Sequence, residues 1–191
     1  MELMLLRVFQ GQIFFQCQVF KLATFDFSSS VLTRDMVRSW CAIQNMLNAA
    51  ANISKALWGQ GGKLAAERKE LRDSIEVLDD SPLRSVTMRN NFEHFDERLD
   101  KWWKESKGHS MADFNFGDPH EHIQRFDEID IFRNFLPRTG ELIFWSQRFD
   151  LQAIANEIER ILPKVEQEAR KRHWEPRTSR RSEAASSTPD E

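Results

Sequence analysis

The 191-residue chain is long enough for one domain with a buried core and a tail. Hydrophobic residues make up 40% and charged residues 30%, a balance that excludes a membrane-embedded or a wholly disordered protein. The formal net charge of -3 excludes a uniformly basic surface, so any contact with nucleic acid must come from a local patch.

Two cysteines, Cys17 and Cys41, lie among apolar residues, and we predict that both are buried free thiols in a reducing compartment. The first residues are apolar, but an acidic second residue and Arg7 make them unlike a secretory signal. No apolar run reaches the length that spans a bilayer. We therefore expect a cytoplasmic protein that makes no membrane contact.

The first half of the chain has the periodicity of two long helices. Apolar residues recur at helical spacing over residues 3–25, and the serines at 28–30 are expected to end this helix. A second helix is predicted to reach about residue 58, with Thr33 or Asp35 as its N-cap. A glycine-rich turn follows and is expected to end it.

Two further helices are predicted over 63–78 and 84–105, separated by a turn at 79–82. The apolar stripe of the first consists of Leu64, Leu71, Ile75 and Leu78. The stripe of the second consists of Met88, Phe92, Phe95, Leu99, Trp102 and Trp103. Four helices joined by short connections are typical of an antiparallel bundle.

The second half of the chain is more varied. Residues 106–130 are expected to form a long loop, and 131–136 with 141–146 a small β-hairpin. Asp150 is the predicted N-cap of a last helix that reaches about residue 172.

These elements predict a mainly α fold in three parts. Residues 1–105 form a helical bundle, and residues 106–172 supply a loop, the β-hairpin and a C-terminal helix that pack on it. Residues 173–191 have few apolar side chains to bury, so we expect a disordered basic and polar tail.

The fourth predicted helix carries an unusual polar face. Asn90 and His94 are four residues apart and therefore neighbours, with His94 pointing away from the core stripe. On an ideal helix Arg89 lies about 140° from His94, so both would reach one phosphate most easily in a cleft shared with a second copy. A working site thus predicts a homodimer. The alternative is an ordinary solvated helix in which Arg89 pairs with Glu93.

The pattern Arg89-Asn90-x-x-x-His94 resembles the R-x4-H motif of HEPN domains, in which asparagine often follows the arginine. The resemblance covers residues 1 to about 105. It implies a HEPN-like antiparallel helical bundle and a metal-independent endoribonuclease without a cofactor, as in toxins and antiviral defence proteins. It also implies a possible partner chain, either an antitoxin or a nucleotidyltransferase.

The residue types agree with that chemistry. A histidine can move a proton at neutral pH when the 2′-hydroxyl of RNA attacks the adjacent phosphorus, and this assigns His94 as acid or base. Arg89 would stabilise charge on the phosphoryl oxygens, and Asn90 would position the phosphate or the imidazole. The family also contains members that bind nucleotides or partners without cleaving, so a non-catalytic scaffold is the second hypothesis.

Basic side chains elsewhere are candidates for holding the RNA backbone. They are Arg98, Lys101, Arg170, Lys171 and Arg172. The alternative for the last three is a set of cations at a helix C-terminus, followed by a soluble tail.

A histidine-rich stretch at 118–122 raises the question of a metal site, with His109 or Asp113 as a further ligand. Its spacing matches no standard zinc finger and no cysteine is nearby. A solvated loop explains it better, so no metal site is predicted.

Overall fold

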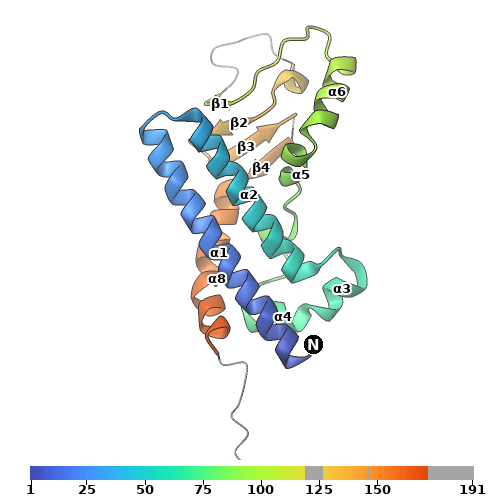
Figure 1. Cartoon of the computed structure of the whole chain (residues 1–191). Coiled ribbons are helices and arrows are strands. Elements are labelled where there is room, and N and C mark those ends of the chain that lie inside the picture. The colour runs from blue at the N-terminus through green and yellow to red at the C-terminus, as the bar shows by residue number, and fades with distance from the viewer. Residues whose placement is uncertain (119–126, 146, 172–191) are drawn as a thin grey trace, which may run out of the picture.

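The computed structural model describes residues 1–118, 127–145 and 147–171. Its longest elements are the helices α1 (Leu3–Leu32), α2 (Met36–Trp58) and α8 (Leu151–Ala169). α1 and α2 lie side by side as an antiparallel pair, and α8 packs against α1 (Figure 1). The prediction of a mainly helical protein is confirmed, as is the packing of a C-terminal helix on the N-terminal helices.

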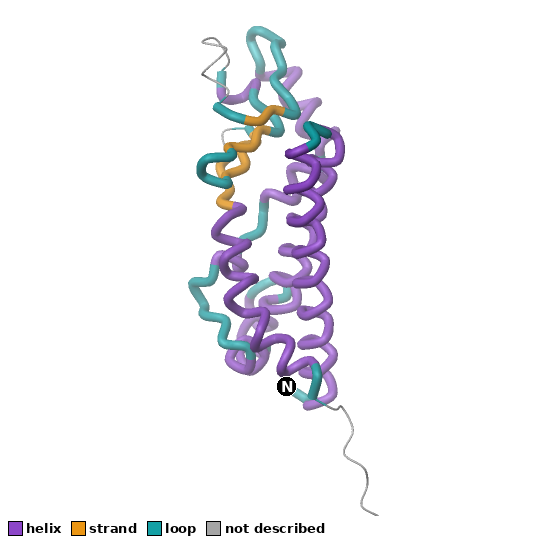
Figure 2. The backbone as a smooth tube through the Cα atoms, turned by 90° about the vertical axis from the view of Figure 1, so that its left-hand side faces the viewer, coloured by secondary structure: helices purple, strands orange, loops and turns teal. Residues whose placement is uncertain are grey.

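Shorter elements complete the chain. After α2 come α3 (Gly62–Glu67), α4 (Lys69–Ser74), the 3-10 turn η1 (Pro82–Arg84), α5 (Met88–Glu93) and α6 (Phe95–Glu105). The strands are β1 (Asn115–Phe116), β2 (Asn134–Leu136), β3 (Glu141–Phe144) and β4 (Gln147–Asp150), with the turn η2 (Glu128–Asp130) before β2. The sheet lies at one end of the molecule and the C-terminal end of α8 at the other (Figure 2).

The expected end of the first helix at the serines is wrong, because α1 continues through them to Leu32. The hydroxyls of Ser28 and Ser29 each donate a hydrogen bond of 3.0 Å to the carbonyl four residues earlier. Ser30 is buried and shares a hydrogen bond of 2.8 Å with Ser39 of α2. Serine hydroxyls bonded to the preceding turn are compatible with a helix, so the run lengthens α1 instead of ending it.

The ends of α2 follow the prediction. The carboxylate of Asp35 accepts a hydrogen bond of 3.0 Å from the backbone N–H of Arg38, so Asp35 and not Thr33 is the N-cap. At the other end Gly59 has a φ of 63°, a conformation that glycine adopts without strain.

The single helix predicted over 63–78 is wrong, because Arg68 separates α3 from α4. Arg68 donates to the carbonyls of Lys55 and Ala56 near the end of α2, and buried Arg72 donates to that of Leu57 at 2.9 Å. These guanidinium groups satisfy carbonyls that the end of α2 leaves free. With these bonds formed, the helix is interrupted at Arg68, between α3 and α4.

The fourth predicted helix is also divided. It begins at Met88, and His94 separates α5 from α6. Its apolar stripe is buried only in part, since Met88 and Trp102 are buried whereas Trp103 is 64% exposed. The exposure of Trp103 corrects the prediction, because its ring is not part of the core cluster and instead contacts the ring of His109.

The predicted β-hairpin is confirmed and is part of a larger sheet with the order β1-β2-β3-β4. β2 and β3 pair antiparallel, with Phe135 opposite Leu142. β1 adds to β2 in parallel, and β4 adds to β3 antiparallel. Asp150 ends β4 and caps α8 as predicted, accepting a hydrogen bond of 2.7 Å from the N–H of Ala153.

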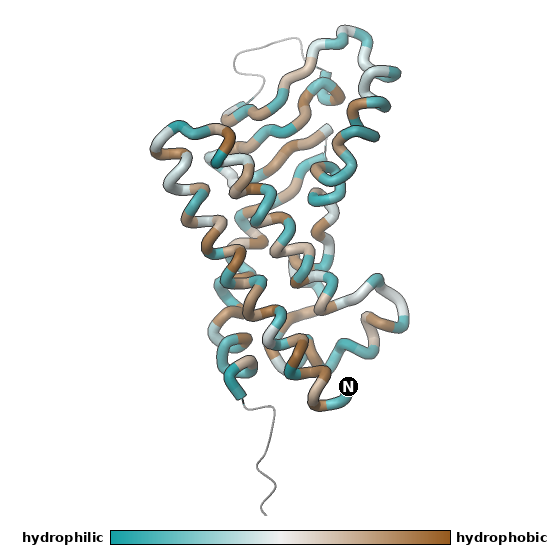
Figure 3. Tube along the Cα trace, viewed as in Figure 1, coloured by the Kyte–Doolittle hydropathy of each residue, from teal (hydrophilic) through white to brown (hydrophobic). Residues whose placement is uncertain are grey.

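One core cluster joins the helices and the sheet, with Phe20, Phe132 and Phe144 among its largest buried side chains. Figure 3 shows apolar residues recurring along the whole length of α1 and α2. Cys17 belongs to this core, and burial raises the pKa of its thiol to about 12. The prediction that Cys41 is buried is wrong, since it lies on the outer side of α2 and is exposed.

Candidate functional site

The motif residues lie at the junction of α5 and α6. Arg89 and Asn90 are in the first turn of α5, and His94 ends that helix with φ and ψ of -105° and 40°. Hydrogen bonds from the N–H of His94 to the carbonyl of Asn90 (3.0 Å), and from that of Arg98 to the carbonyl of His94 (3.1 Å), keep helical spacing on both sides. The backbone angles of His94 itself are not helical, so the single straight helix predicted from the sequence is interrupted at this residue.

Arg89 is held mostly by its own helix. One terminal nitrogen pairs with Glu93 at 3.0 Å and donates to the Oδ1 atom of Asn90 at 3.4 Å. Its Nε atom is buried and has no hydrogen-bond partner among the described residues. The side chain as a whole is 18% exposed.

His94 is more open. Its side chain is 52% exposed, and Nδ1 lies 3.3 Å from a carboxylate oxygen of Glu97. Within the described ranges, no hydrogen bond or ion pair joins His94 to Arg89. Each of the two holds a different carboxylate, so one copy of the chain does not bring them onto a common partner.

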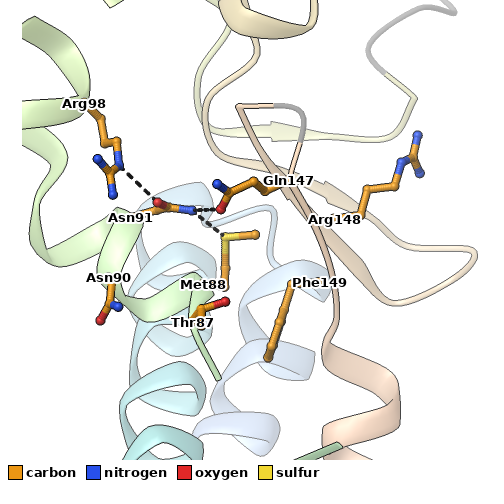
Figure 4. A pocket seen from close by; sticks show the side chains of 8 residues that line it. All are labelled: Thr87, Met88, Asn90, Asn91, Arg98, Gln147, Arg148 and Phe149. Carbon is orange, nitrogen blue, oxygen red and sulfur yellow. Dashed lines mark hydrogen bonds between the residues drawn. The ribbon is translucent and has the colours of Figure 1, made fainter. Parts of the chain in front are cut away.

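A cavity of about 420 Å³ adjoins the motif between α5, α6 and β4 (Figure 4). It is lined by Thr87, Met88, Asn90, Asn91, Arg98, Gln147, Arg148 and Phe149. Of the predicted catalytic residues only Asn90 lines it, together with the predicted RNA-binding Arg98.

Asn91 organises one wall of this cavity. It is 3% exposed, donates 2.8 Å to the side-chain oxygen of Gln147 and accepts 3.1 Å from the Nε atom of Arg98. Figure 4 shows Arg98, Asn91 and Gln147 as one bonded row. Sequence reasoning missed Asn91 and Gln147, because nothing local distinguishes a buried asparagine from the exposed Asn90 beside it.

Arg98 presents its charge to the cavity. The bond to Asn91 uses only Nε, and no carboxylate of the described residues lies within ion-pair distance of its guanidinium. Arg148, also in the lining, is 61% exposed and lies 3.5 Å from Glu141. Figure 4 shows the Arg148 side chain pointing away from the other lining side chains, so the cavity combines the guanidinium of Arg98 with amide side chains, a set of donors that suits phosphate or nucleotide oxygens.

The other predicted RNA-binding residues that the structure describes do not line this cavity. Lys101 is exposed, 4.9 Å above the ring of Trp145 and 3.8 Å from Glu105. Arg170 and Lys171 follow α8, where they pair with Glu166 and Glu168, at the end of the molecule opposite the sheet (Figures 1 and 2). The structure does not bring them to the motif, and Arg172 lies outside the described residues.

The alternative metal ligands are separated. His109 bonds to the carbonyl of Trp103 at 3.0 Å, whereas Asp113 pairs with Arg133. No group of histidine, cysteine or acidic side chains suited to a metal occurs in the described part of the chain. His120 and His122 lie outside it.

Comparisons with known proteins add no identification. A scan against family models, a search of curated proteins and a search of solved structures found no match to this chain. Among the helices that the structure describes, none combines the length and apolar character needed to cross a membrane.

Proposed function

We propose that this protein is a HEPN-like, metal-independent endoribonuclease that acts as a homodimer in the cytoplasm, in a toxin or antiviral defence system. The observation that carries the proposal is the Arg89-Asn90-x-x-x-His94 motif at a helix junction, with a half-exposed imidazole. Beside it lies a cavity lined by Asn90 and the guanidinium of Arg98, which carries no carboxylate partner among the described residues.

In this proposal His94 takes the proton of the 2′-hydroxyl while that oxygen forms a bond to the adjacent phosphorus. The bond from phosphorus to the 5′ oxygen breaks, and this oxygen takes a proton from a second imidazole or from water. Arg89 stabilises the charge on the phosphoryl oxygens and Asn90 positions the phosphate. The products are a 2′,3′-cyclic phosphate and a 5′-hydroxyl, and no metal takes part.

In the free protein, the carboxylates of Glu93 and Glu97 occupy the positions on Arg89 and His94 that the RNA phosphate would take. Glu93 holds Arg89 and Glu97 holds His94 in the free protein, so a phosphate has to replace the carboxylates. Both carboxylates are exposed by at least 41%, which makes these pairs weak and easily exchanged. Arg98, in the next turn of α6, would hold a neighbouring phosphate.

The proposed catalytic site is tested by measuring RNA cleavage in the absence of divalent metal. The wild-type protein, His94→Ala and Asn90→Ala are incubated with single-stranded RNA in EDTA. We expect cleavage by the wild type and a loss of at least about 100-fold in rate for His94→Ala, the usual effect of removing a general acid or base.

Asn156→Ala is the matched control for Asn90→Ala, because Asn156 is an exposed asparagine of α8 whose side chain bonds to Gln152 and to no other described residue. It should cleave like the wild type. Equal cleavage by the wild type and His94→Ala would contradict the proposed catalytic role.

A non-catalytic scaffold is the second candidate, and one observation favours it. Both charged members of the motif are already paired within their own helices, as in an ordinary solvated helix. A scaffold of this kind would bind RNA or a partner chain, such as an antitoxin or a nucleotidyltransferase. Binding without cleavage by the wild-type protein would support it.

A further inference from the structure

The outward face of α1 is apolar and uncovered. Six large side chains on this face are each 54% to 85% exposed. They are Met4, Val8, Phe15, Leu22, Phe25 and Leu32, and we call them the α1 stripe. The opposite face of α1 packs against α2 and α8, so this long helix is apolar on two sides. An apolar helix face is normally buried against another element, so a helix with two apolar faces is expected to be covered on both.

The spacing of the α1 stripe is that of a helix-pairing seam. Its members are spaced by three, four or seven residues, and Gly11, Gln18 and Ser29 occupy the positions between them, so that the whole series recurs every three or four residues. This is a heptad pattern sustained over the whole helix, the pattern by which one helix packs lengthwise along another. No charged residue falls within the seam.

Gly11 adds an independent indication. Glycine weakens a helix interior, yet Gly11 lies in the third turn of α1 between Val8 and Phe15 of the stripe. A Cβ atom built on Gly11 would meet nothing within 4 Å. No contact with the described residues therefore requires glycine here, whereas close approach of an outside helix would.

The exposed area matches what a stable interface needs. Taking about 200 Å² for each fully exposed residue, the value for large aromatic side chains, the stripe offers at most roughly 800 Å² per chain. That is the area which a standard interface buries on each partner. A patch this large is unusual on the surface of a monomer.

We propose that the α1 stripe pairs with the α1 stripe of a second copy of this chain. A two-fold axis makes one patch complementary to itself, which suits an uncharged seam centred on Gln18. The side-chain amide of Gln18 both donates and accepts, so it can bond to its own copy across the axis.

This interface is distinct from the proposed catalytic cleft. α2 contacts both α1 and α5 and lies between them (Figure 1), so α1 and the junction of α5 and α6 are on different sides of α2. The proposal does not depend on ribonuclease activity, and either can fail without the other. If both interfaces form, the assembly is a tetramer with two kinds of dimer contact.

The first test is the molar mass of the full-length protein by light scattering after size-exclusion chromatography. Phe15→Glu with Leu22→Glu places charges in the seam and should halve the mass of the wild-type assembly. Gln12→Glu is the control, because Gln12 is exposed on α1 beside the seam, and it should keep the mass. Circular dichroism identifies any variant that has lost its helices.

The second test needs no disruptive substitution. In a Cys41→Ser background, Gln18→Cys should form a disulfide-linked dimer on mild oxidation, since the axis brings the two copies of this position together. Glu159→Cys, at an exposed position of α8, should not.

Two results would overturn the α1 pairing. One is a wild-type mass that the double variant leaves unchanged, together with no disulfide from Gln18→Cys. The other is a monomeric wild type that binds vesicles of phosphatidylcholine and phosphatidylglycerol through Phe15 and Leu22, which would assign the stripe to a lipid surface.

Discussion

Asn90 and Asn91 are consecutive in sequence but have opposite surroundings. Asn90 is exposed at the edge of the cavity, whereas Asn91 is buried and bonded to Gln147 of β4 and Arg98 of α6. The first is a candidate for contact with substrate. The second fixes the position of α5 against the sheet and aims Arg98, because its amide satisfies groups on both elements.

This difference predicts a separation of stability from activity. Asn91→Ala leaves Gln147 and Arg98 without their buried partner and should lower the free energy of unfolding by about 1–3 kcal/mol. Asn90→Ala removes an exposed side chain and should change it by less than about 0.5 kcal/mol. Urea denaturation measures both. Equal losses of stability would show that Asn91 does not have this structural role.

At the scale of elements, the helix ends that depend on local chemistry were predictable. Asp35 and Asp150 cap α2 and α8 through bonds to N–H groups three residues ahead. Such bonds join residues that are close in sequence, so the sequence alone predicts them. The break at His94 was not predictable. There the next residue, Phe95, packs against Phe132 and Phe144 from a distant part of the chain.

In the sheet, too, one strand was predictable from the sequence and another was not. Apolar residues at Leu142 and Ile143 identified β3, because that strand enters the core. β4 was missed because Gln147 and Arg148 are polar and exposed, so only its pairing with β3 makes it a strand. For the site, the motif was readable as a short pattern, whereas the cavity required knowing that β4 comes to lie beside α5.

The contact between α1 and α8 should respond to pH. Lys171 and Arg7 donate hydrogen bonds to Glu168 and hold the pKa of its carboxyl below the usual value, against the effect of burial. The carboxylate therefore stabilises the fold above the unfolded pKa of about 4.3, and this contribution disappears as the pH falls through the lower folded value.

Glu168→Gln tests this contact. At pH 7 the substitution should lower the free energy of unfolding by about 1–2 kcal/mol, because Arg7 and Lys171 lose a charged acceptor. The difference from the wild type should shrink as the pH is lowered from neutral toward 3. Lys69→Gln, which removes an exposed ion pair with Asp73, is the control and should show little difference at any pH. A difference for Glu168→Gln that does not depend on pH would contradict the assignment.

At the scale of the whole molecule, the proposed nuclease needs two copies. Arg89 and His94 hold separate carboxylates within one chain, so a productive site would take Arg89 from one copy and His94 from the other. Arg89→Ala and His94→Ala should each be inactive alone.

Mixing these two variants tests the arrangement. When they are unfolded together and refolded, heterodimers regain one complete site, and the mixture should recover about a quarter of wild-type activity in a two-fold symmetric dimer. Each variant refolded alone is the control. A mixture as inactive as its components would show that Arg89 and His94 do not act across two subunits.

The central claim is that His94 drives attack by the 2′-hydroxyl, and the most direct measurement is the identity of the RNA ends formed in EDTA. Mass spectrometry of a defined oligonucleotide should find 2′,3′-cyclic phosphate and 5′-hydroxyl ends with the wild-type protein and none with His94→Ala. A substrate whose 2′-hydroxyl is replaced by hydrogen at every position should remain intact. Cleavage of that substrate, or products with 5′-phosphate ends, would contradict the account.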